Sequence, residues 1–111
     1  MAGYAELLDR IDRLAARADT LRADDALLSE IEDVLAEGYM QALTEEARSR
    51  RLAARIERLI ETLDEPGAAV EARRIAVQRR TLDQRIDTLR LRLDAIREQF
   101  VRLGGGQRVS G

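Results

Sequence analysis

Two runs of apolar residues, each repeating at alternating steps of three and four, flank a single Pro66-Gly67 in this chain of 111 residues. Such spacing places the apolar side chains on one face of an α-helix. Pro cannot continue a helix and Gly permits a positive φ, so we expect the chain to reverse between the runs. The first run contains Leu28, Ile31, Leu35, Leu52, Ile56, Leu59 and Leu63; the second contains Ile75, Leu82, Ile86, Leu89, Leu93, Ile96, Phe100 and Leu103. The pattern predicts an all-α fold, built on a long antiparallel helical hairpin of the coiled-coil type.

Folded back about the turn, the two runs predict a register in which facing positions pair in layers. Leu35 is then opposite Ile96, and Ile56 is opposite Ile75. The middle of the first run holds Gly38, Ala42, Glu45 and Ser49, and their expected partners are Leu93, Leu89, Ile86 and Leu82. Mostly small residues therefore face large ones, which predicts a close approach of the two helices at this waist.

Arg79 is the one charged residue in the second run, and its expected partner is Leu52. A polar residue at a single seam position can set the register of a coiled coil at a cost in stability. Alternatively, the aliphatic stem packs on the seam while the guanidinium reaches water. A contact with a partner protein is a third possibility for this residue.

A further amphipathic helix is expected over residues 3–22, which would complete a three-helix bundle. Its apolar stripe contains Tyr4, Leu7, Leu8, Ile11, Leu14, Ala15, Ala18 and Leu21. We place a break at residues 23–25, where Asp24 or Asp25 can cap the next helix, although one helix over 3–63 is the alternative. The expected helices are about 3–22, 25–63 and 68–103 within a single domain, 1–103. The Gly-rich segment 104–111 is expected to be a flexible tail.

A second apolar stripe lies beside the waist, on another face of the same helix. It contains Leu27, Val34, Tyr39, Met40 and Leu43. Because a self-sufficient hairpin does not need this stripe, we interpret it as an interaction surface. The first helix is long enough to lie antiparallel over residues 25–44, and a second copy of the chain is the other candidate to cover the stripe.

Composition argues against an enzyme. The chain has no Cys and no His, which removes the usual zinc sites and the commonest nucleophile and base, and its hydroxyl residues lack a His or Lys to activate them. We therefore expect no catalytic residue, no cofactor and no metal site. All 19 basic residues are Arg, as in proteins encoded by GC-rich bacterial genomes. With no signal peptide or spanning segment visible, we expect a cytoplasmic protein with no membrane contact.

Two sets of charged residues suggest other roles for the hairpin. Asp64 and Glu65 lie at its tip. In general shape the hairpin resembles that of some bacterial transcription factors, which push an acidic-tipped helical hairpin into the secondary channel of RNA polymerase, where the tip carboxylates help to hold magnesium. The arm also carries Arg51, Arg55, Arg58, Arg73 and Arg80. These can pair with phosphates, or with the carboxylates interleaved among them.

The sequence thus predicts a non-enzymatic structural or adaptor protein that acts through coiled-coil contacts between helices. We expect it to bind itself, as a homodimer, or another helical protein. Two alternatives stay open. One is a regulator that inserts its hairpin arm into a large machine such as RNA polymerase, and the other is a weak, Arg-mediated nucleic-acid binder. Aromatic residues for base stacking are absent from the arm, which disfavours the second alternative.

Overall fold

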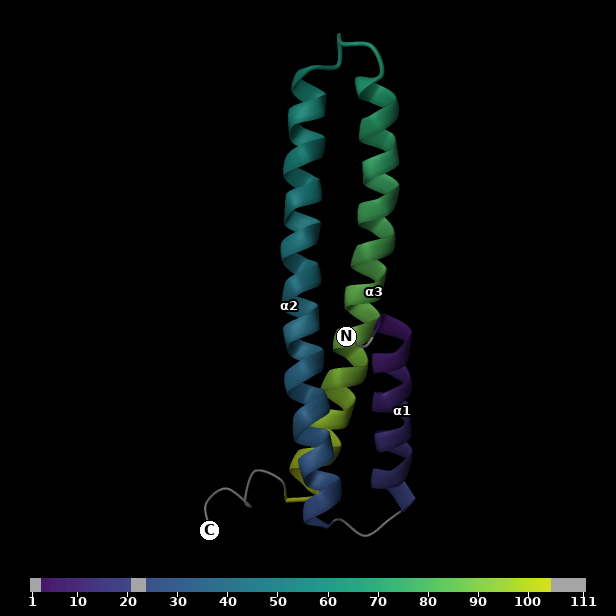
Figure 1. The fold of residues 1–111 in the computed structure, drawn as a ribbon, viewed down its shortest axis with the longest axis vertical. Coiled ribbons are helices and arrows are strands. Elements are labelled where there is room, and N and C mark those ends of the chain that lie inside the picture. The colour runs from purple at the N-terminus through teal and green to yellow at the C-terminus, as the bar shows by residue number, and fades with distance from the viewer. Residues whose placement is uncertain (1–2, 21–23, 105–111) are drawn as a thin grey trace. The chain divides into compact units, whose positions relative to one another are not determined.

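The computed structural model describes residues 3–20 and 24–104, and it contains three helices in this part of the chain. They are α1 (Tyr4–Thr20), α2 (Asp25–Glu61) and α3 (Ala68–Arg102), with α2 and α3 joined as an antiparallel hairpin (Figure 1). The described residues form no strand. The predicted all-α fold is confirmed, including the hairpin and the additional N-terminal helix packed against it.

The breaks between helices lie close to their expected positions. Because α1 ends at Thr20 and α2 begins at Asp25, a continuous helix over residues 3–63 is excluded. By contrast, α2 runs without interruption through Gly38 and Thr44. Leu21 of the expected first stripe and residues 105–111 of the expected tail lie outside the described residues.

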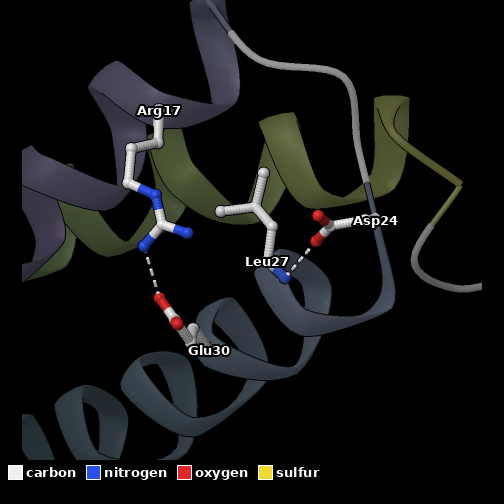
Figure 2. Close-up of polar contacts among 4 residues, drawn as sticks. All are labelled: Arg17, Asp24, Leu27 and Glu30. Atoms are coloured by element: carbon white, nitrogen blue, oxygen red, sulfur yellow. Dashed lines mark hydrogen bonds and ion pairs between the residues drawn. The ribbon is translucent and has the colours of Figure 1, made fainter.

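The N-terminus of α2 is capped by Asp24. Its carboxylate accepts a hydrogen bond of 2.7 Å from the backbone N–H of Leu27, three residues ahead (Figure 2). The carbonyl of Asp24 accepts the first helical bond, from the N–H of Leu28 at 3.0 Å. Both features define an N-cap, in which a side-chain oxygen satisfies a donor that the first turn leaves without a helical partner. Of the two predicted caps, Asp24 takes this role.

The hairpin turn is a chain of short backbone bonds that ends in a left-handed glycine. The N–H groups of Thr62, Glu65 and Ala68 each bond the carbonyl three residues earlier, at 2.9–3.2 Å. Gly67 has a φ of 82°, as its place after Pro66 predicts. A second left-handed glycine, Gly104 with a φ of 84°, follows the end of α3.

The chain divides into two compact units, and we describe each by itself. The three-helix unit comprises Met1–Gln41 and Leu89–Gly111, and the hairpin unit comprises Ala42–Thr88. Helices α2 and α3 each contribute to both units. The expectation of one domain over 1–103 stays a prediction.

The core of the three-helix unit draws on all three helices. Its buried apolar residues are Leu7, Ile11, Leu14, Leu27, Leu28, Ile31, Val34, Leu89, Leu93 and Ile96. Helix α1 runs antiparallel to α2, because Arg17 pairs with Glu30 and Arg10 pairs with Glu37 (Figures 1 and 2). The predicted placement of α1 over the second apolar stripe is therefore confirmed for the first part of that stripe, Leu27 and Val34.

Packing in the hairpin unit is less even, because only two helices cover the seam. On α3, Ala68, Ile75, Leu82 and Ile86 are buried, whereas on α2 only the small residues Ala42 and Ser49 are buried. The larger α2 seam residues Leu52, Ile56 and Leu59 are half-buried. The seam is therefore closed on its α3 side and partly open on its α2 side.

Candidate interaction surfaces

The second apolar stripe is divided by the position of α1. Leu27 and Val34 are buried in the core of the three-helix unit, so they support the fold. Tyr39 is half-buried, and Met40 is 64% exposed. Leu43, in the hairpin unit, is 56% exposed. Thus only the last part of the predicted stripe is available to a partner, and whether one binds there stays a prediction.

Tyr39 joins α2 to α3 through its hydroxyl, which donates a hydrogen bond of 2.6 Å to Asp94. The guanidinium of Arg97 stands 5.9 Å from the centre of the Tyr39 ring, within the range of a cation–π contact. Burial raises the pKa of the Tyr39 hydroxyl above its ordinary value, and so do the hydrogen bond to the Asp94 carboxylate and its charge. This residue therefore serves the three-helix unit as a cross-link between helices.

Charged residues between α1 and α2 are engaged with each other. A hollow there is lined by Arg10, Arg13, Leu14, Arg17, Glu30 and Asp33. Arg17 bonds Glu30 at 2.6 Å, Arg10 pairs with Glu37, and Arg13 pairs with Asp9 at 2.9 Å. Arg10 and Arg17 therefore join α1 to α2, whereas the pair of Arg13 with Asp9 lies within α1. Glu30 and Glu37 thus join α2 to α1, whereas Asp33 lines the hollow and is exposed.

Arg79 belongs to a polar layer in the hairpin seam. The hydroxyl of Ser49 is 6% exposed and donates a hydrogen bond of 2.6 Å to Asp83. The same hydroxyl accepts a hydrogen bond of 3.2 Å from Nε of Arg79, and Arg79 lies 3.8 Å from Asp83. The sequence indicated Leu52 as the residue facing Arg79, but the polar partner lies about one turn away on the same helix face. Within this layer every member has a partner.

The predicted tip and arm residues are on the surface of the hairpin unit. Asp64 and Glu65 are exposed in the turn, and Arg51, Arg55, Arg58, Arg73 and Arg80 are exposed on the two helices. Of these five arginines, Arg55 pairs with Glu71. The other four form no ion pair within 4.0 Å among the described residues. Of the five predicted arginines, only Arg55 thus pairs with an interleaved carboxylate among the described residues, and Arg74, outside that set, lies 3.7 Å from the same Glu71.

Apolar side chains are exposed around the turn. Ile60 is 54% exposed, Leu63 is 51% exposed and Val70 is 69% exposed, and Pro66 is exposed between them. Ile60 and Leu63, together with the half-buried α2 seam residues Leu52, Ile56 and Leu59, form what we call the open edge of the hairpin unit. The apolar repeat of the sequence includes the seam residues of this edge. How far they are exposed depends on how many helices cover the seam, which the repeat does not specify.

No protein-family model matches the chain, and no curated protein or solved structure matches it significantly. No helix among the described residues has the length and apolar character needed to cross a membrane. The described residues define an all-α protein with a three-helix unit and a two-helix hairpin unit, and the hairpin unit has an open apolar edge near its turn.

Proposed function

We propose that this chain is a non-enzymatic structural or adaptor protein that acts through coiled-coil contacts between helices. The open edge of the hairpin unit is its docking element. The partner is either a second copy of the chain or another helical protein. The observation that carries the proposal is the contrast between the closed α3 side and the open α2 side of the same seam.

Burial of the open edge supplies the driving force. Fully burying one Leu or Ile side chain contributes about 1.5–3 kcal/mol. Ile60 and Leu63 are each about half exposed, and Leu52, Ile56 and Leu59 are half-buried, so a helix laid along this edge gains part of that value at several positions. Apolar residues at helical spacing suit a helical partner, because a helix presents ridges that fit between them.

The proposal is tested by capturing partners in the cells that naturally make this chain. A tagged chain should retain either untagged copies of itself or one other helical protein. The double substitution Ile60→Asp with Leu63→Asp should abolish this retention without unfolding the chain, because both side chains are already half exposed. As a matched control, Leu91→Asp with Val101→Asp charges two exposed apolar residues of the three-helix unit and should leave retention unchanged.

Two results would overturn the proposal. In the first, the native chain and the double variant retain the same proteins. The other is equal loss in the control variant, which would place the contact outside the open edge. Retention of RNA polymerase that requires Asp64 and Glu65 would support the alternative of an inserted hairpin arm. Retention of DNA or RNA that falls steeply with salt would support the Arg-mediated alternative.

A further inference from the structure

The hairpin unit is banded by charge around its turn. Residues 59–72, which we call the tip, contain four carboxylates and no Arg. The flanking segments 48–58 and 73–85, which we call the collar, each contain five Arg and one carboxylate. Because the hairpin is antiparallel, the two collar segments lie at the same height on α2 and α3 (Figure 1). An acidic band at the turn is therefore followed by a basic band on both helices.

Most of the charge in these bands is not neutralised inside the chain. The tip carboxylates Glu61, Asp64 and Glu65 are exposed and form no ion pair among the described residues. The same holds for six collar arginines: Arg48, Arg50, Arg51, Arg58, Arg73 and Arg80. Only Glu71 of the tip is engaged, with Arg55 and Arg74. Opposite charges thus remain exposed in two adjacent bands of the hairpin unit.

The open edge extends through both bands. Ile60 and Leu63 belong to the tip, and the half-buried Leu52 and Ile56 belong to the collar. The long aliphatic stems of collar arginines can cover apolar side chains while their guanidinium groups reach carboxylates. A collar is therefore suited to cover a tip, both by charge and by apolar contact.

We propose that the occupant of the open edge is a second copy of this chain, docked antiparallel so that the tip of each copy lies on the collar of the other. This inference rests on the proposed function and names its partner. A symmetric antiparallel dimer makes the contact twice. A dimer with both tips pointing the same way would place tip on tip and collar on collar, and like charges facing each other are unfavourable.

The dimensions agree with this arrangement. At 1.5 Å per residue, a collar segment of 11 residues is about 16 Å long, and the α2 part of the tip, residues 59–61, is about 5 Å long. A tip therefore fits within the length of one collar. The overlap is confined to the hairpin unit and requires no change in the three-helix unit.

Charge reversal followed by mixing tests the inference on the purified, full-length chain. The tip variant carries Glu61→Arg, Asp64→Arg and Glu65→Arg, and the collar variant carries Arg50→Glu, Arg73→Glu and Arg80→Glu. Sedimentation velocity should show a dimer for the native chain. In each variant alone, we expect the dissociation constant to rise by about a hundredfold, because like charges then face each other twice. An equimolar mixture of the two variants should restore the dimer, because both contacts regain opposite charges.

Controls separate this inference from the proposed function. Helical circular dichroism of each variant establishes that it is folded, and Glu6→Arg with Glu98→Arg reverses two exposed charges of the three-helix unit and should not alter dimerisation. A native chain that stays monomeric, or variants that dimerise like it, or a mixture that stays monomeric, would each overturn the antiparallel dimer. The proposed function would survive these results if another helical protein is retained through Ile60 and Leu63, and it would fail if nothing is.

Discussion

Gly38 of α2 lies directly against Leu93 of α3 inside the three-helix unit. A Cβ atom at position 38 would overlap Cδ2 of Leu93 and stand 3.0 Å from its Cδ1. Leu93 is fully buried, so it has little room to move aside. The absence of a side chain at Gly38 is thus what allows Leu93 to fill the space between the helices.

This contact predicts that the effect of Gly38→Ala on the free energy of unfolding changes sign when Leu93 is shortened. In the native chain the added methyl overpacks the core at about 1–3 kcal/mol, and the better helix propensity of Ala returns about 1 kcal/mol, so we expect a net loss of about 1 kcal/mol. In a Leu93→Ala background the methyl enters the vacated space and should stabilise the chain by about 1 kcal/mol. Urea denaturation of the four chains measures both steps. Stabilisation by Gly38→Ala in both backgrounds would show that the helices are not in close contact here.

The cap at Asp24 predicts that substitutions lower the stability of the chain chiefly when they remove the side-chain oxygen. Asp24→Ala removes the acceptor for the Leu27 N–H and should lower the free energy of unfolding by about 1 kcal/mol. Asp24→Asn keeps an oxygen at the same place and should cost only a few tenths of that value. Urea denaturation of the two variants compares them directly. Equal losses would mean that the charge of Asp24, and not its hydrogen bond, supports α2.

Tyr39 predicts a fall in stability at alkaline pH. Its pKa in the folded chain is raised above the ordinary 10.0, so the folded state holds the proton more tightly than the unfolded state. This contribution is fully present below about pH 10 and is lost as pH rises through the raised pKa. The chain has no Lys and no Cys, and Tyr4 is its one other tyrosine, so a single further substitution isolates the signal of Tyr39.

A Tyr4→Phe background isolates Tyr39, and tyrosinate absorbance then reports its titration. We expect a midpoint above that of the urea-unfolded chain, together with a decrease in melting temperature over the same pH range. Tyr39→Phe should remove the pH dependence of the melting temperature. A midpoint at or below the unfolded value would contradict the hydrogen bond to Asp94, which favours the neutral phenol.

The register of the hairpin was predictable because one turn and a strict repeat determine which positions face each other. The repeat therefore predicts Gly38 opposite Leu93, and the structure confirms this contact. Exposure was not predictable in the same way. Leu52 and Ile56 occupy the same heptad positions as the buried Ile31 and Leu28, but they are only half-buried because no third helix covers them in the hairpin unit. A sequence repeat predicts which face of a helix is apolar, but it does not predict which other helix covers that face.

The apolar repeat also could not predict the polar contacts that lie beside the seam. Tyr39 was expected to contribute an apolar surface, yet its hydroxyl bonds Asp94, because the rotation of α2 places the ring next to α3. Similarly, nothing in the heptad pattern pairs Ser49 with Arg79 and Asp83. Both contacts depend on side-chain length and on the direction in which each side chain leaves its helix.

The polar layer at Ser49 predicts that a single substitution costs stability and a second one restores it. Ser49→Ala removes the hydroxyl that bonds both Asp83 and Arg79, and we expect a loss of about 1–2 kcal/mol. Adding Arg79→Leu replaces the remaining charge on the seam with an apolar side chain beside the half-buried Leu52, which should return the chain to at least native stability. Urea denaturation gives the three free energies. If the double variant stays as unstable as Ser49→Ala, the cost comes from lost packing at position 49 and not from a charge left without its partner.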